Sequence, residues 1–340
     1  MFINQRQMIR TYPKDSLGYL LFCHDNDYSF DAFSVSQRED IVFPSLSVAI
    51  PYYEAKNTIN LTLECLLNSI KGIKEVQNNW QSEVIVIDDG SVNYPAKKAI
   101  KPEYLSHVRL INLPQNLGRF AARNVGIKDA KYDFMIFSDA DILVNKETLM
   151  SHLNIYTSIK KQNKNVITAS VFNFIDLGQI TENNGQLFND TNDFRVDCTY
   201  HATWIGCEDD KQFVGSKYQV LEQTNNFRNW SKTGMLGPWA LSNMVLGGFF
   251  GFSTELAKQV GGCDRLFSDY GFEETSLATK LIALHDSYVV PVLSGYAIHV
   301  SDPESTLPQS EKNRFFQKAH ALYFKEYLYY DKKQATKEKI

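Results

Sequence analysis

Two aspartates one residue apart, Asp139 and Asp141, directly follow the short apolar run 134–138. Such a run predicts a strand that is buried on both faces. Open α/β sheets bind their ligands beyond the carboxyl ends of the strands, and carboxylate oxygens there can hold a divalent cation that bridges the protein to a phosphate. The alternative is a pair of ordinary turn residues, and the Asp-x-Asp spacing alone does not decide between them.

A second pair of carboxylates, Asp88 and Asp89, ends another apolar run, and Gly90 then permits a tight turn. The elements around both pairs alternate in type, because helical spacing of apolar residues over 57–73 and 117–131 separates runs that read as strands. Strands are predicted over 45–53, where Pro51 is expected to halt the strand, and over 83–88, 108–112 and 134–138. This order predicts an α/β fold with a parallel sheet between helices.

The second half of the chain is less regular. Residues 173–240 are rich in Asn, Asp, Gln and Gly and lack periodicity, which predicts a functional insertion. Near the start of the chain, residues 17–22 are a candidate strand. Further helices are predicted over 146–160, 254–260, 273–284 and 313–330, strands over 165–172 and 287–293, the end of another strand over 297–300, and a frayed end over 331–340.

Composition narrows the function classes. The chain has 340 residues, of which 44% are hydrophobic, and a net charge of −4, which argues against binding to nucleic acid or to an anionic membrane. Its five cysteines form no CxxC pair, which fits a reducing compartment and excludes a simple zinc motif. The sequence shows neither a signal peptide nor an 18-residue apolar stretch, so we expect a cytoplasmic protein, with peripheral recruitment to the inner face of a membrane as the alternative.

Several motifs follow one another in a single order. They are Val-Ala-Ile-Pro-Tyr-Tyr-Glu at 48–54, Val-Ile-Asp-Asp-Gly-Ser at 86–91, Asn-Leu-Gly-Arg-Phe-Ala-Ala-Arg-Asn-Val-Gly at 116–126, Phe-Ser-Asp-Ala-Asp at 137–141, Gly-Gly-Phe-Phe-Gly-Phe at 247–252, Gly-Phe-Glu-Glu at 271–274, and His299. This set resembles the family 2 glycosyltransferases with the GT-A fold, a Rossmann-like mixed sheet flanked by helices. The resemblance is dense over 45–145 and returns over 245–300.

The resemblance implies roles for the acidic pairs. Asp139 and Asp141 would bind Mn²⁺ or Mg²⁺ against the diphosphate of a UDP-sugar, with Asp141 the more direct ligand and Asp139 in contact with ribose or metal. His299 would be a late metal ligand, and imidazole suits Mn²⁺ better than Mg²⁺. Asp88 would accept a hydrogen bond from the uracil imide, since an ionised carboxylate only accepts, and Asp89 would share or support this role.

The remaining positions of the motifs are assigned in the same way. Pro51, Tyr53 and Glu54 would wall the nucleotide pocket. Arg123, or alternatively Arg119, would approach the base or the diphosphate, and both could instead be solvent-facing helix residues. Paired Gly247 and Gly248 would line the sugar-donor pocket, where bare backbone can approach the sugar, and Trp239 is a candidate for stacking on a sugar face.

Glu274 matches the general base that deprotonates the acceptor in inverting members of the family, with Glu273 holding hydroxyl groups of donor or acceptor. This chain departs from the usual Glu-Asp pair at that position, and the longer side chain changes the geometry on which a general base depends. The structural alternative is that two acids at a helix N-terminus merely complement the helix dipole.

The sequence therefore predicts a metal-dependent glycosyltransferase, of the hexosyl or N-acetylhexosaminyl type, that moves a sugar from a UDP-sugar to a hydroxyl of a glycan, lipid-linked or protein acceptor with inversion. The Gly-Gly-Phe-Phe segment and the following Glu-Glu also look like polypeptide N-acetylgalactosaminyltransferases, which retain configuration, and like chondroitin-polymerase enzymes. A retaining enzyme and a non-catalytic nucleotide-sugar-binding partner of a glycan-assembly complex are the alternatives. A nucleotidyltransferase is disfavoured, because 51–56 is not a Gly-rich basic loop.

The predicted organisation has three parts: an N-terminal extension at 1–44, a GT-A catalytic domain at 45–300 and a C-terminal helical tail at 301–340. Within the catalytic domain, 45–145 is the nucleotide-binding half, 146–245 the insertion and acceptor region, and 246–300 the acceptor and catalytic half.

Overall fold

The computed structural model describes residues 12–24, 41–182, 199–201, 213–216, 240–243, 245, 247–303, 307–337 and 340. Among them, no helix has both the length and the apolar character needed to cross a membrane. Most of the predicted insertion, including Trp239, lies outside the described residues.

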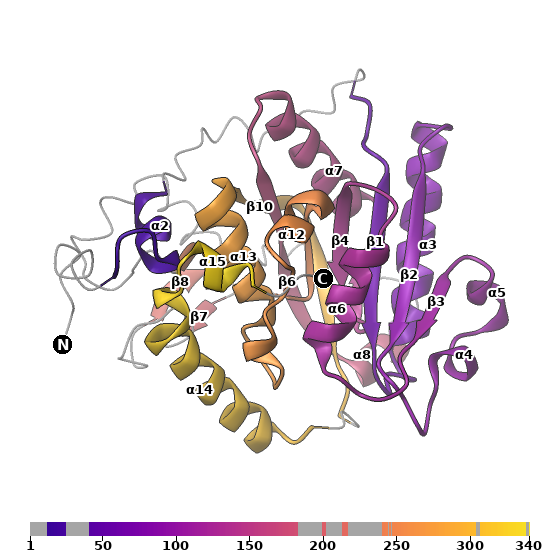
Figure 1. Cartoon of the computed structure of the whole chain (residues 1–340). Helices are drawn as coiled ribbons and strands as arrows, with labels where there is room; N and C mark the ends of the chain where they lie inside the picture. Colours follow the sequence, from indigo (N-terminus) through magenta and orange to yellow (C-terminus); the bar gives the residue numbers. More distant parts are fainter. Residues whose placement is uncertain are drawn as a thin grey trace.

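A mixed sheet forms the centre of the molecule (Figure 1). Its strands are β1 (Leu46–Tyr52), β2 (Ser82–Asp88), β3 (Arg109–Asn112), β4 (Phe134–Ser138), β5 (Ile142–Val144), β6 (Val166–Asp176), β9 (Phe249–Ser253) and β10 (Tyr288–Ser301). They are arranged in the order β3-β2-β1-β4-β9-β6-β10-β5. The first four run parallel, whereas β9 is antiparallel to both of its neighbours. The predicted mixed α/β sheet is confirmed.

Helices lie on both faces of this sheet (Figure 1). The α-helices are α2 (Leu17–Cys23), α3 (Ile59–Val76), α4 (Ala96–Ala99), α5 (Pro102–Leu105), α6 (Arg119–Asp129), α7 (Lys146–Lys161), α8 (Leu177–Glu182), α11 (Ala240–Asn243), α12 (Thr254–Gln259), α13 (Glu273–His285), α14 (Gln309–Lys325) and α15 (Lys332–Ala335). Two 3₁₀ turns, η4 (Arg265–Phe267) and η5 (Tyr327–Tyr329), and a separate hairpin of β7 (Thr199–His201) and β8 (Phe213–Ser216) complete the described elements.

The two faces of the sheet carry separate hydrophobic cores. Along β1, Val48 and Ile50 belong to the core under α3 and α7, whereas Ala49 between them belongs to the core under α6 and α13. Neighbouring residues of a strand point to opposite faces, so a strand with apolar residues at every position is buried on both sides. The same holds for β4, all of whose residues are buried. Because β4 is buried up to its last residue, Ser138, the first aspartate of the Asp-x-Asp pair, Asp139, is the first residue beyond the end of this strand.

Three sequence predictions were wrong in detail. Residues 17–22 form the helix α2, because Ser16 caps it by accepting from the Tyr19 N–H, and Leu17 and Leu21, one turn apart, are both fully buried. The strands predicted over 287–293 and 297–300 are one strand, β10, whose register shifts between Val292 and Ala297. Pro51 lies inside β1 rather than at its end.

The C-terminal segment 331–340 was predicted to fray, but its described residues are ordered by side chains of their own. Asp331 and Gln334 form a reciprocal capping box at the start of α15. Ala335 is buried in the same core as α13, and Ile340 packs against that core. The tail is therefore continuous with the core of the sheet.

Candidate active site

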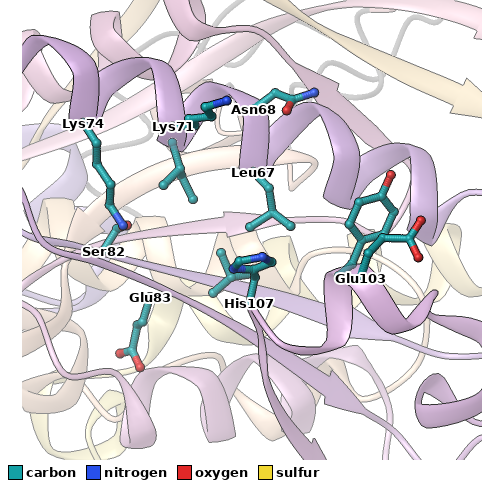
Figure 2. A pocket seen from close by; sticks show the side chains of 11 residues that line it. Leu67, Asn68, Lys71, Lys74, Ser82, Glu83, Glu103 and His107 are labelled. Carbon is teal, nitrogen blue, oxygen red and sulfur yellow. The ribbon is translucent and has the colours of Figure 1, made fainter.

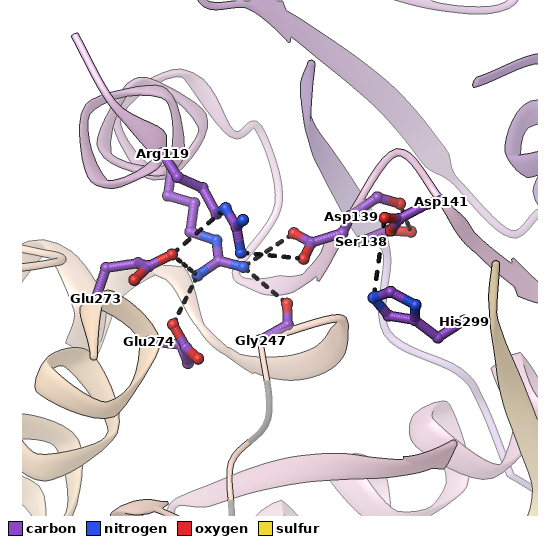
Figure 3. A network of polar contacts seen from close by, with 9 residues as sticks. Arg119, Ser138, Asp139, Asp141, Gly247, Glu273, Glu274 and His299 are labelled. Carbon is purple, nitrogen blue, oxygen red and sulfur yellow. Dashed lines mark hydrogen bonds and ion pairs between the residues drawn. The ribbon is translucent and has the colours of Figure 1, made fainter. Parts of the chain in front are cut away.

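Asp139 stands where β4 ends and is paired with two guanidinium groups (Figure 3). Its backbone N–H donates to the carbonyl oxygen of Gly248 at 2.8 Å. Its Oδ1 accepts from Arg123 Nη2 at 3.0 Å, and its Oδ2 lies 3.5 Å from Arg119 Nη1. The carboxylate is therefore part of a charged network rather than an isolated turn residue.

Arg123, on the inner face of α6, joins three separate parts of the chain. Its side chain is fully buried, and Nη2 also donates to the carbonyl oxygen of Gly247 at 2.8 Å. Its Nη1 lies 3.2 Å from Glu274 Oε2 and 3.5 Å from Glu273 Oε1. Burial lowers the pKa of a guanidinium, but the surrounding acids more than offset it, so the pKa of Arg123 is raised and the group stays charged.

This burial corrects the role predicted for Arg123. A side chain with no exposed surface cannot approach a base or a diphosphate as it stands. Arg119, one turn earlier on α6, is the accessible arginine of the pair, with 37% of its side chain exposed. Its contact to Asp139 is longer than that of Arg123, at 3.5 Å against 3.0 Å, whereas its contact to Glu273, at 3.4 Å, is about the same length as that of Arg123.

Glu273 and Glu274 are the first two residues of α13 and meet the arginines of α6 across the site (Figure 3). Glu273 is almost fully buried, whereas 16% of the Glu274 side chain is exposed. Burial and the neighbouring charge of Glu273 raise the pKa of Glu274 to about 7, against the opposing effect of Arg123 and Arg119. A carboxyl group with a pKa near neutrality is suited to accept a proton at physiological pH.

At the paired glycines Gly247 and Gly248, the absence of a side chain lets neighbouring side chains pack closely against the backbone. A Cβ on Gly247 would lie 2.8 Å from Arg123 Nη2 and 3.0 Å from the Glu274 carboxyl carbon. A Cβ on Gly248 would lie 2.9 Å from side-chain atoms of Ile142 and Phe172. A side chain at either position would therefore collide with its neighbours, whereas the predicted approach of a sugar to the bare backbone stays a prediction.

Asp141 and His299 form a second, more open cluster beside Asp139 (Figure 3). His299 is placed by β10, in register with Ile142 of β5, and its Nε2 lies 3.8 Å from Asp141 Oδ2. About a third of each side chain is exposed. Asp141 Oδ1 and His299 Nδ1 are buried atoms with no hydrogen-bond partner, and such atoms usually have one.

The net charge and the donor atoms of these two clusters indicate whether a divalent cation fits there. When ionised, the four carboxylates Asp139, Asp141, Glu273 and Glu274 outnumber the guanidiniums Arg119 and Arg123 by a formal charge of −2. The partnerless oxygen of Asp141 and the imidazole of His299 are donors that Mn²⁺ accepts. Within the described residues no three acidic, His or Cys side chains already form a complete metal site. The residues fit a cation that takes further ligands from a substrate.

Asp88 and Asp89 organise the loops at the end of β2. Asp88 accepts from the N–H groups of Ser91 and Ala96, at 2.9 and 2.7 Å. Asp89 accepts from the N–H groups of Leu117 and Gly118, both at 2.9 Å, just before α6. Both aspartates are nearly fully buried. Every carboxylate oxygen of the pair thus has one backbone partner, so any contact with a base would use a remaining lone pair.

Glu54 holds the loop that follows β2. Its carboxylate accepts from the N–H groups of Val92, Asn93 and Tyr94, at 2.7 to 2.9 Å, while its own N–H donates to Ser91 Oγ. Its φ of 53° is left-handed, which is uncommon for a residue with a side chain.

The predicted pocket wall is only partly formed by these residues. Pro51 is half-buried, Tyr53 is 42% exposed, and the exposed rim also includes Val92 and Tyr94. Sequence reasoning did not single out Val92 or Tyr94, because nothing in their spacing indicates that Glu54 gathers their backbone.

Two further residues at the site were missed. Phe174 is the cross-strand partner of His299, with ring centroids 5.2 Å apart, and it is 59% exposed. Gly118 precedes α6 with a φ of 93°, and a Cβ there would lie 2.7 Å from the carbonyl oxygen of Ser268. Only Gly118 had a sequence signal, as a glycine at a helix start.

Figure 2 shows a separate pocket, of about 440 Å³, that none of the residues of this cluster lines. Its lining includes Lys71 and Lys74 of α3, Glu83 near the start of β2, and Glu103 and His107 at and after α5. Glu83 stands near the start of β2, whereas Asp88 ends β2 and Asp139 follows β4, so this pocket lies toward the other end of the sheet.

Comparison with known proteins bears on the family and the fold. Residues 47–207 match the glycosyl transferase family 2 model. The predicted resemblance to this family is thereby confirmed over the matched region, and the sheet is that of the GT-A fold.

Two curated relatives illustrate the range of the match. An uncharacterized glycosyltransferase of Haemophilus influenzae is 32% identical over 138 residues, covering 39% of this chain and 49% of that protein. Chondroitin synthase of Pasteurella multocida is 24% identical over 310 residues, covering 86% of this chain and 29% of that protein. The chain therefore spans about half or less of the length of these relatives.

Among solved structures, a mannosyltransferase from Pyrobaculum calidifontis in complex with GDP-Man and Mn²⁺ superposes with a TM-score of 0.50. It is 14% identical and the match covers 87% of this chain and 66% of that one. This likeness concerns the fold.

Proposed function

We propose that this chain transfers a sugar from a UDP-sugar to an acceptor hydroxyl in the biosynthesis of a glycan, polysaccharide or glycoconjugate, as a hexosyl- or N-acetylhexosaminyltransferase. The family match and the names of relatives, chondroitin synthase among them, support this class of reaction. The solved mannosyltransferase with GDP-Man and Mn²⁺ supports a nucleotide-sugar donor and a divalent metal.

The observation that carries the proposal is the charge of the site. Four carboxylates and two arginines from three parts of the chain meet at the carboxyl end of the sheet, and their excess negative charge is suited to one divalent cation. Asp141 and His299 would hold that cation, with Asp139 beside them. When bound, it would neutralise charge that develops on the departing diphosphate.

The nucleotide would lie over the loops that follow β1 and β2. Pro51, Tyr53 and Glu54 would wall its pocket, and Asp88, supported by Asp89, would accept from the base edge. Arg119 is the arginine with exposed surface for the diphosphate, since Arg123 is enclosed among the acids.

Glu274 would act as the general base. The acceptor oxygen would form a bond to the anomeric carbon while the bond from that carbon to the diphosphate oxygen breaks, and the hydroxyl proton would pass to the Glu274 carboxylate. A single displacement of this kind inverts the anomeric configuration. Glu273 would hold Arg119 and Arg123 in place, because its carboxylate lies within 3.5 Å of both guanidinium groups. NMR analysis of the product anomer tests this step, and retained configuration contradicts it.

The exposed ring of Phe174 beside His299 is suited to a sugar, because an apolar ring face can cover the C–H face of a pyranose. Replacing Phe174 by Ala is expected to raise KM for the acceptor by about tenfold, which corresponds to the loss of one aromatic contact. The Phe174→Tyr variant should stay near wild type. Equal KM values in all three proteins would contradict this placement.

The whole proposal is tested with a panel of UDP-sugars, by measuring Mn²⁺-dependent release of UDP. We expect release with at least one donor and its loss in the Asp141→Ala variant, while near-UV circular dichroism shows an unchanged fold. Glu147→Ala, an exposed acid on α7, is the matched control and should retain activity. Tight UDP binding without turnover of any donor would favour the non-catalytic binding partner instead.

A further inference from the structure

The two acids at the start of α13 follow an unusual stretch of backbone. Gly271 and Phe272 both have positive φ, 96° and 67°, and Phe272 is the residue directly before Glu273. Glycine adopts this conformation without penalty, whereas for a bulky aromatic residue it is an outlier that persists only where surrounding structure enforces it. The cause must lie in what the Phe272 ring contacts.

The ring of Phe272 is buried in an aromatic cluster contributed largely by α14. Its centroid lies 5.1 Å from that of Tyr323 and 5.3 Å from that of Phe316, both on α14, and 6.1 Å from that of Phe267 on η4. Only 3% of Phe272 is exposed. Phe316 also lies against Gly271, where a Cβ would come within 3.2 Å of it. Side chains of α14 thus pack against both positive-φ residues, Gly271 and Phe272.

The same helix is hydrogen-bonded to the elements on either side of the site. The hydroxyl of Tyr323 lies 2.9 Å from Ser242 Oγ, on α11 just before the paired glycines, and 2.8 Å from Thr279 Oγ1 on α13. On η5, just after α14, the hydroxyl of Tyr327 donates to the carbonyl oxygen of Ser276 at 3.3 Å. These contacts join the tail to the helix that carries the acids, and to the segment that leads to Gly247.

We infer that Phe272 is a positioning residue for Glu274, and that α14 acts on the site through it by holding the left-handed backbone with which α13 begins. The carbonyl oxygen of Phe272 accepts the first hydrogen bond of the helix, from the Ser276 N–H at 2.8 Å, so the conformation of Phe272 sets where the first turn starts. That turn presents Glu273 and Glu274 to Arg123. The inference deepens the proposed function and rests on Glu274 being its base.

An alternative is that Phe272 fills the core and nothing more. Glycine is the residue that the φ of 67° would ordinarily favour, and a ring that served only as filling could be carried on unstrained backbone. The two accounts differ in what Phe272→Gly should do. Glycine keeps the allowed backbone and removes the ring, so the helix start is no longer held.

The first experiment compares Phe272→Gly and Phe316→Leu with Phe315→Leu, a control on the same helix whose ring contacts Arg314. Steady-state kinetics should show kcat lowered by about 100-fold in Phe272→Gly and by a smaller factor in Phe316→Leu, the effect of misplacing a catalytic group by ~1 Å. KM for the donor and UDP affinity should stay within about twofold, because the nucleotide side of the site is untouched.

The second readout does not depend on turnover. The Glu274 carboxyl carbon, labelled with ¹³C and assigned with Glu274→Gln, is titrated by NMR in each protein. The titratable and charged groups that face it are Glu273, Arg119, Arg123, Tyr270 and Cys263. We expect the titration midpoint to move from near neutrality toward the ordinary glutamate range in Phe272→Gly, as the carboxyl leaves its buried site, and to stay in place in Phe315→Leu.

An unchanged midpoint and kcat in folded Phe272→Gly would overturn the inference, as would losses that only follow the folded fraction seen by circular dichroism. If the wild-type protein turns over no donor, the proposed function fails by itself, while the NMR midpoints still report whether Phe272 positions Glu274.

Discussion

Arg123 carries one positive charge into a fully buried position and shares it among Asp139, Glu273 and Glu274. Replacing it by Met would keep much of the volume but leave three carboxylates facing one another without this partner. Removing one member of a buried ion pair costs about 3–5 kcal/mol. We therefore expect Arg123→Met to lower the free energy of unfolding by about that amount in urea denaturation followed by circular dichroism.

Arg119 is the natural comparison, because it contacts two of the same acids from a position that is 37% exposed. Arg119→Gln should lower stability by less than about 1 kcal/mol, as for other solvent-screened pairs. It should nevertheless reduce affinity for UDP if Arg119 meets the diphosphate. Equal destabilisation by both substitutions would contradict the argument from burial.

The raised pKa of Glu274 predicts how the stability of the protein depends on pH. Its pKa is raised to about 7 in the folded chain, above the ordinary value of 4.5, chiefly by burial and by Glu273. Between those two values the folded state binds more protons than the unfolded state, so this group's contribution to stability is present below pH 4.5 and is lost as pH rises through about 7. Wild type should therefore lose stability relative to Glu274→Gln between pH 5 and pH 8.

Urea unfolding at several pH values measures this difference directly. The control is Glu147→Gln, an exposed acid whose removal should leave the pH dependence as in wild type. A wild-type curve parallel to that of Glu274→Gln would show that Glu274 is ionised throughout.

At the scale of elements, the loop 91–94 depends on Glu54 more than on its own sequence. One carboxylate accepts three successive N–H groups, and hydrogen bonds to a charged group contribute about 1.5–3 kcal/mol. Glu54→Gln places an amide against those donors and should loosen the loop. We expect affinity for UDP to fall by about tenfold while kcat at saturating donor is nearly unchanged.

Isothermal titration calorimetry with UDP and Mn²⁺ measures that loss, and Glu103→Gln, on the far side of β2 beside the separate pocket, is the control. Full affinity in Glu54→Gln would mean that the loop does not contribute to the nucleotide site.

Elements with a strong repeating pattern could be predicted from the sequence. The run 134–138 gave a strand with the same bounds as β4, and the helices α6 and α7 lie within two residues of their predicted ends. Residues 17–22 could not be assigned correctly, because a short apolar run fits a buried helix as well as a strand, and only the packing of Leu17 and Leu21 decides between them.

In the candidate site, too, some features could be predicted from the sequence and others could not. The carboxylates were found because each follows a strand or starts a helix, which is a local signal. The enclosure of Arg123 could not be found, because it depends on acids some 150 positions away that the fold brings to within 3.5 Å. Likewise, the packing beside Gly247 and Gly248 depends on side chains of other elements. Sequence position indicates which residues gather, but not which of them face solvent.

At the scale of the whole molecule, the C-terminal tail is part of the core rather than an addition to it. Tyr323, Tyr327 and Leu328 are fully buried in the core that includes α13, and Ala335 of α15 is nearly so. Fully burying one large apolar side chain contributes about 1.5–3 kcal/mol, so these residues together approach the 5–15 kcal/mol by which a typical domain is stable. A chain ending at residue 308 should therefore lack a cooperative unfolding transition.

Near-UV circular dichroism during urea titration measures that transition, and a chain ending at residue 337 is the control, since it keeps α14, η5 and α15. If the shorter chain unfolds cooperatively and near the wild-type midpoint, the boundary predicted at residue 301 separates an independent tail after all. If it is folded but binds UDP without turnover, the tail serves the acids of α13 more than the core. Loss of both folding and binding is the result we expect, because the sheet face that carries α6 and α13 would then lose part of its cover.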